Sequence, residues 1–198
     1  MPILASLTIA DDAAAWAAAG FDTTRIGAVD LLFVDGSDGI VGWGFAALDD
    51  RVTSIDGIPT AAVQRQAMQP ATHPNGTTSI DHVVVTTPDS ARTTTALEAV
   101  GLPAKRTRDI GRGMQQVFFR AGEVILELVG PVEPTGDGPA GFFGLAVNVE
   151  DIDATKAHLG DRCTDPKDAV QPGRRIATLK TRDLGIATSI AFMTPHPR

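Results

Sequence analysis

Two stretches of this sequence carry the same succession of secondary-structure signals, and this repeat restricts the possible fold more than any other feature. In the first stretch, residues 79–131, the apolar and β-branched run Ser79–Val85 predicts a buried strand. A helix signal follows over Ala91–Val100 and ends at a glycine. Two extended runs, Met114–Arg120 and Glu123–Val129, then predict the strands of a hairpin.

The second stretch, residues 141–195, repeats this order with a strand signal, a helix signal and two further strand signals. They fall at Gly144–Val149, Ala154–Leu159, Arg174–Lys180 and Ile186–Met193. A helix covers only one face of such a sheet, so each unit needs a partner for the remainder of its apolar surface. We therefore predict an α+β fold in which two βαβββ modules lie side by side as a half-barrel with a cleft.

The N-terminal residues form a weaker copy of the same pattern. A strand signal at Ile3–Ile9 precedes an alanine-rich helix signal and further strand signals, so residues 1–58 are interpreted as a degenerate βαβββ-like unit. Residues 59–78 contain many helix and strand breakers and are interpreted as a linker, with a short helix as an alternative for Thr60–Met68. Three units cannot all pair within one chain, so the odd unit is expected to dock on the sheet or across a homodimer.

The composition restricts the partners of the protein. The chain of 198 residues has a net charge of -7, which argues against nucleic acid and anionic membranes as partners. Its single cysteine, Cys163, excludes an intrachain disulfide. The sequence carries neither a secretory signal nor an apolar run long enough to cross a membrane, so a cytoplasmic location is expected.

The motifs of the two modules resemble a known superfamily. They are Ile80–Val85 followed by Pro88-Asp89, Val124–Leu128 followed by Pro131, and Leu145–Val147 followed by Glu150–Asp153. Residues 79–195 are similar to the paired βαβββ modules of the vicinal oxygen chelate superfamily, which comprises glyoxalase, bleomycin-resistance and dioxygenase proteins. The two copies together, residues 79–198, would then form a glyoxalase-like domain.

The resemblance implies a place for a divalent metal, held by the first and last strands of both modules. His82 and Glu127 occupy two of the four family positions, whereas Gly144 and Ala191 occupy the other two and offer no side-chain ligand. The resemblance allows Zn, Mn, Fe, Ni or Mg at this place. Because two side chains form a small ligand set, it favours a cleft without metal.

The hairpin places further residues beside Glu127. If Ala121-Gly122 is the two-residue turn, then Gln116, Phe118 and Glu127 share one face of the sheet. Gln116 could hydrogen-bond the carboxylate of Glu127 or replace a ligand. For His82, the alternative to a functional role is that of a hydrogen-bonded core residue.

Arg174 is the remaining candidate. Alignment of Gly173 with Gly113 places Arg174 on the face of Gln116, where its guanidinium could bind a carboxylate or phosphate of a substrate. The alternative is a surface ion pair with an acidic residue.

These residues predict a small-molecule enzyme of the lyase or isomerase type. His82 and Glu127 would abstract a proton next to a carbonyl, and Gln116, Phe118 and Arg174 would bind the substrate. The alternative is a non-catalytic protein that binds or sequesters small molecules, as the drug-sequestering members of the superfamily do.

Overall fold

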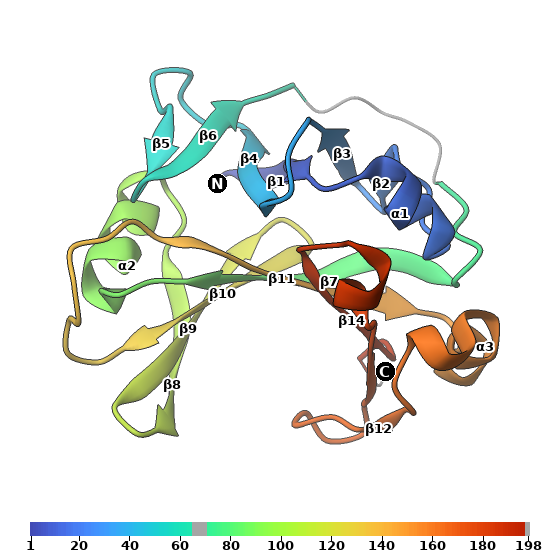
Figure 1. The fold of residues 1–198 in the computed structure, drawn as a ribbon. Coiled ribbons are helices and arrows are strands. Elements are labelled where there is room, and N and C mark those ends of the chain that lie inside the picture. Colours follow the sequence, from blue (N-terminus) through green and yellow to red (C-terminus); the bar gives the residue numbers. More distant parts are fainter. Residues whose placement is uncertain (65–70, 197–198) are drawn as a thin grey trace.

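The computed structural model describes residues 1–64 and 71–196. The strands of this α+β fold belong to two mixed sheets, one of six strands and one of eight. Neither sheet closes into a barrel in the described residues, because the strand at each end pairs on one side only. Figure 1 shows the eight-stranded sheet curved as an arch, with the six-stranded sheet above its convex side.

The eight-stranded sheet consists of two halves of like topology. Its order is β12-β13-β14-β11-β7-β10-β9-β8, so the first strands of the two predicted units, β7 and β11, pair at the centre. β7 is parallel to β10, β11 is parallel to β14, and β7 and β11 are antiparallel to each other. The strands are β7 (Thr77–Thr86), β8 (Ala104–Gly111), β9 (Met114–Ala121), β10 (Val124–Pro131), β11 (Gly141–Val149), β12 (Lys167–Asp168), β13 (Arg175–Thr178) and β14 (Ser189–Met193).

One helix accompanies each half, where the sequence predicts it. Asp89 caps α2 (Ser90–Ala99) and accepts the backbone N–H of Arg92, and Asp151 caps α3 (Ile152–Leu159) and accepts those of Asp153 and Ala154. The two helices lie at the outer flanks of the arch (Figure 1). Two short 3-10 helices, Gly160–Arg162 and Thr181–Leu184, follow in the second half.

Side chains alternate between the two faces of the arch, as the strand period requires. On β10, Leu126 and Leu128 are buried towards the convex side, whereas Glu127 is half-buried on the concave side. Val83 and Val85 of β7 likewise join the core. The convex face is therefore packed with apolar side chains, and the concave face is mixed, with Glu127 and His82 beside Ile125, Val84 and Val129.

The six-stranded sheet corrects the interpretation of the N-terminal residues. Its order is β2-β3-β1-β4-β6-β5, in which β1 is parallel to β3, β4 is parallel to β6, and β1 and β4 are antiparallel at the centre. This is the topology of the larger sheet in shortened form, so the segment holds two reduced units rather than one degenerate copy. The elements are β1 (Ile3–Ala10), α1 (Ala13–Ala18), β2 (Arg25–Ile26), β3 (Val29–Phe33), β4 (Gly39–Ala46), β5 (Ser54–Ile55) and β6 (Ile58–Ala62).

Two expectations change with this topology. The four units pair within one chain, so no odd unit requires a second subunit. Thr60 to Ala62 belong to β6 and form no helix, because Thr60 accepts a hydrogen bond from buried Trp43 and β6 pairs with β4. The remainder of the alternative helix, from residue 65, lies outside the described residues.

The two sheets share one hydrophobic core and several polar contacts. Phe21 stacks on Phe192 with ring centroids 5.9 Å apart. Asp11, buried before α1, accepts hydrogen bonds from the indole of Trp16 and from the backbone N–H groups of Ala187 and Thr188. These contacts fix the six-stranded sheet against the convex side. In the described part of the chain, no helix combines the length and apolar character that crossing a bilayer requires.

His73, on the segment that joins the two sheets, provides a pH test of this packing. Its Nδ1 accepts the backbone N–H of Asp22 at 2.9 Å. Burial lowers the pKa of His73 below its ordinary value of 6.5, although the charge of Asp22 opposes this shift. The unfolded chain therefore binds a proton before the folded one does as the pH falls through the ordinary value.

We expect the contribution of His73 to the free energy of unfolding to be complete above that value and to decrease as the pH falls towards the lowered pKa. Urea denaturation at about pH 7.5 and about pH 5.5 measures this decrease. In His73→Asn the amide oxygen can accept the same N–H without titrating, so its stability should depend less on pH. Equal pH slopes for the two proteins would contradict the prediction.

Candidate functional site

A β-bulge in β7 brings the side chains of Asp81 and His82 together. His82 pairs with Ala146 of β11, and Ile80 pairs with Val147, so Asp81 is the extra residue of the bulge. Neighbouring residues of a regular strand point to opposite faces, whereas here His82 Nδ1 lies 2.9 Å from Asp81 Oδ2. The bulge thus places a carboxylate directly behind the imidazole.

Glu127 lies on the other side of the same imidazole. β10 is parallel to β7, and Ile125 pairs with His82 two residues before Glu127. The Nε2 atom of His82 is 3.7 Å from Glu127 Oε2, and each of the two side chains is 14% exposed. The predicted pair therefore does meet on the concave face, where both groups retain access to solvent.

Gln116 completes this side of the site. Its Nε2 donates to Glu127 Oε1 at 2.6 Å, one of the two roles that the sequence allows. The predicted register was wrong by two residues, because the hairpin loop is Gly122-Glu123 and Phe118 pairs with Glu127. A shift of two residues preserves the side-chain faces, so Gln116 and Phe118 still share the face of Glu127.

Arg174 has partners other than those the sequence suggests. Its side chain is 0% exposed, and it donates to both carboxylate oxygens of Asp81, at 2.9 and 3.2 Å. It also donates to the Thr194 carbonyl at 2.7 Å and to Asn148 Oδ1 at 2.9 Å. The expected role as a substrate ligand needs correction, since a substrate anion would have to displace Asp81 from a buried ion pair.

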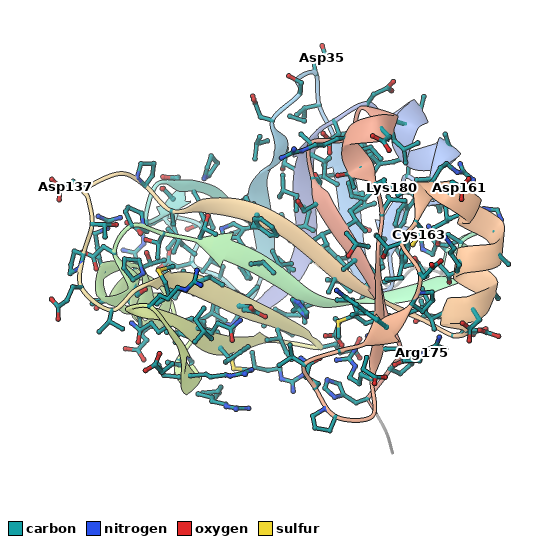
Figure 2. All side chains as sticks on the ribbon, turned by 60° about the horizontal axis from the view of Figure 1, so that its bottom comes forward. Asp35, Asp137, Asp161, Cys163, Arg175 and Lys180 are labelled. Atoms are coloured by element: carbon teal, nitrogen blue, oxygen red, sulfur yellow. The ribbon has the colours of Figure 1, made fainter. Side chains whose placement is uncertain are left out.

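Arg175, the residue after Arg174, has a different environment. It is the first residue of β13, near α3 (Figure 2), and pairs with the exposed Asp153 of that helix. Of two consecutive arginines, one therefore belongs to the outer flank and the other to the interior behind His82.

Asp81 is held in its ionised form. Burial alone would raise the pKa of its carboxyl, but hydrogen bonds from His82 and Arg174, together with their positive charge, hold the pKa well below its usual range. An ionised carboxylate only accepts hydrogen bonds, so Nδ1 of His82 carries a hydrogen that it donates to Asp81. With Nδ1 directed at Asp81, the other ring nitrogen, Nε2, is the one that faces Glu127.

His82 and Glu127 are two groups that can each give or take a proton. Their facing atoms, Nε2 and Oε2, are 3.7 Å apart, which is longer than a hydrogen bond, so neither is occupied by a bond to the other. Two groups in complementary protonation states are what proton transfer at carbon requires.

The residues present do not fit the divalent metal that the resemblance implies. A Cβ on Gly144 would lie 2.0 Å from the carbonyl oxygen of Ser189, so no ligating side chain can occupy that position. Ala191 offers none, and Asp81 is committed to Arg174. Among residues 1–64 and 71–196, no three His, Cys, Asp or Glu side chains form a group that could hold a metal ion.

Sequence reasoning missed Asp81 and Asn148. Asp81 interrupts an apolar strand directly before His82, which was a signal, but a bulge cannot be recognised without the opposing strand. Asn148 lies at the end of β11, donates to Ser79 Oγ at 3.1 Å and accepts from Arg174. Its role depends on a guanidinium 26 residues away in the chain.

Comparison with solved structures defines the class to which this fold belongs. The structure of a variant of 4-hydroxymandelate synthase from Streptomyces coelicolor aligns with 100% of this chain and 94% of its own, with a TM-score of 0.69 and 15% identity. Methylmalonyl-CoA epimerase from Mycobacterium tuberculosis aligns with 62% of this chain and 91% of its own, with a TM-score of 0.48 and 19% identity. The first similarity supports a fold of the vicinal oxygen chelate type.

The family follows from the sequence profile of the glyoxalase-like domain, which matches residues 3–101. This match covers half of the chain, and the protein belongs to the glyoxalase-like domain family of the vicinal oxygen chelate superfamily. The matched residues include the six-stranded sheet, β7 and α2, and so extend beyond the segment on which the resemblance was first based. No curated protein sequence matches the chain.

The ion pair behind His82 can be tested by a double-mutant cycle. Arg174→Met leaves a buried carboxylate without its partner and should lower the free energy of unfolding by about 3 kcal/mol. Asp81→Asn leaves a buried guanidinium and should cost a similar amount. The double variant should lose less than the sum of the two, because neither charge remains.

Urea denaturation of the four proteins measures this cycle. Arg175→Met removes the exposed neighbouring pair and should change stability far less, which makes it the matched control. Additive losses at Asp81 and Arg174 would contradict the coupling.

Proposed function

We propose that this protein is an acid–base enzyme of the glyoxalase-like family that moves a proton at a carbon next to a carbonyl group, as an isomerase or lyase. The observation that carries the proposal is the separation of 3.7 Å between His82 Nε2 and Glu127 Oε2 on the concave face. The concave face of the arch, to which both modules contribute strands, would receive the substrate.

In the proposed reaction, the carboxylate of Glu127 takes the proton from the carbon acid and becomes a carboxylic acid. The electron pair of the broken C–H bond moves into the carbonyl as an enolate. Imidazolium Nε2–H of His82 then returns a proton to the enolate at another carbon or on the other face, and the imidazole becomes neutral. Transfer of the proton from Glu127 to His82 restores the starting state, so the protons balance over one turnover.

The residues around the pair support these roles. Asp81 fixes the imidazole with Nε2 directed at Glu127, and Arg174 keeps Asp81 ionised and in place. Gln116 donates to Oε1 of Glu127 and leaves Oε2, the oxygen nearest His82, free for the reaction. Arg174 is therefore a positioning residue in this proposal, and Phe118, paired with Glu127 on the neighbouring strand, is a wall of the substrate site.

A specific observation also favours the second candidate function, a non-catalytic binding protein. The second module contributes Gly144, Ala146 and Ala191 to the region beside His82, and none of these can take part in chemistry. Half of the region around His82 therefore offers no group that can transfer a proton. A protein that only binds a small molecule would need no acid–base group there.

Deuterium exchange distinguishes the two functions. A panel of small keto acids and acyl thioesters is incubated with the protein in D2O, and incorporation of deuterium next to the carbonyl is followed by NMR. We expect Glu127→Gln and His82→Gln each to reduce exchange at least a hundredfold, the usual contribution of a positioned acid or base. Binding without exchange in the wild-type protein would favour the sequestering function.

The donor geometry leads us to propose that the reaction proceeds without a metal. Addition of Zn, Mn, Fe, Ni or Mg should then shift the melting temperature of the wild-type protein no more than that of the double variant His82→Ala/Glu127→Ala. Stabilisation of the wild-type protein alone would show that these two side chains form a metal site after all.

A further inference from the structure

A group of cations lies on the strand that borders the concave face of the first module. β8 is the edge strand of the eight-stranded sheet, and seven of its eight residues are exposed. Arg106 pairs with Phe118 and Arg108 pairs with Gln116 on β9. Directly opposed residues share a face, so both arginines lie on the face that carries Glu127 and His82.

The side chain of Arg106 extends over this face. Its Cζ atom lies 5.9 Å from the centroid of the Phe118 ring, within the range of a cation–π contact. Phe118 is itself the residue that pairs with Glu127. The guanidinium thus lies between the edge of the sheet and the proposed reaction centre.

These cations have no acidic partners. In the part of the chain that the structure describes, six of the arginines and lysines form ion pairs with aspartates. Lys105, Arg106, Arg108 and Arg112 form none, although the protein carries a net charge of -7. The β8–β9 hairpin carries these four cations and Arg120 against a single acidic residue, Asp109, and this excess of positive charge attracts anions.

Protection of an exposed edge strand is the alternative explanation for these charges. Charged residues on either face of the edge strand would give this protection, so it does not explain why the arginines share one face. Thr107 and Asp109 of β8 pair with Val117 and Gln115, whose side chains lie on the convex side of the sheet. Both arginines lie on the concave side. This distribution is better explained by a ligand on that face.

We propose that Arg106 and Arg108 form an anion site that holds a carboxylate or phosphate group of the ligand bound beneath the arch. This anion site rests on the proposed function, because it takes His82 and Glu127 as the reaction centre. β8 and β10 are two strand spacings apart, about 10 Å, and an arginine side chain spans part of that distance. The ligand would therefore carry its anionic group a few bonds from the carbon that loses the proton.

The test uses inorganic phosphate and malonate as probes of the 15N-labelled full-length protein at constant ionic strength. Saturable shifts of the arginine Nε–H resonances report binding, and the tighter probe identifies phosphate or carboxylate as the ligand group. Arg106→Gln and Arg108→Gln should each weaken binding about tenfold. Arg182→Gln, which removes another cation outside the observed ion pairs, should leave it unchanged.

Three outcomes would overturn the proposal: shifts that do not saturate, an equal response to sodium chloride, or equal weakening by Arg182→Gln. Circular dichroism verifies that each variant is folded, which is expected because both arginines are exposed. Glu127→Gln should bind the probes as the wild-type protein does. Failure of the anion site therefore remains distinct from failure of the acid–base chemistry, which the exchange experiment measures.

Discussion

The buried ion pair between Asp81 and Arg174 is the interaction on which the arrangement of the site depends. Asp81 belongs to the first module and Arg174 to the second, and 93 residues separate them. Neither charge could remain buried without the other. Their pairing therefore joins the two halves of the arch and at the same time fixes the imidazole of His82, because one oxygen of Asp81 contacts both Arg174 and Nδ1.

This pairing explains why the two modules differ although their topology is the same. In the pairing of β7 with β11, His82 lies opposite Ala146 and Gly144 lies opposite Val84. These two pairs are equivalent if the two modules are exchanged, so Gly144 is the residue of the second module that corresponds to His82. At the position of His82 the second module thus has a glycine whose Cβ would collide with the backbone of β14. The first module supplies His82 and Glu127, and the second supplies the guanidinium of Arg174, which holds Asp81 beside the imidazole.

The sequence predicted the repeated units, their helices and the meeting of His82 with Glu127, because apolar periodicity and helix-start signals are local. It did not predict β8, since an exposed edge strand with the sequence of Ala104–Gly111 has no apolar alternation to detect. It also misassigned Arg174. Whether a guanidinium binds a substrate or a buried carboxylate depends on a contact distant in the chain, and no local pattern encodes that contact.

The six-stranded sheet limits where this protein can act. It packs against the convex side of the arch, and one continuous core fills the space between the two sheets. Asp11 on that side accepts hydrogen bonds from both sheet regions and helps to join them. The concave side carries His82, Glu127, Gln116 and, on β8, Arg106 and Arg108, which form no ion pair among the described residues. Packing does not account for that concentration of polar groups, whereas a ligand that is anionic and is deprotonated at carbon would use every one of them.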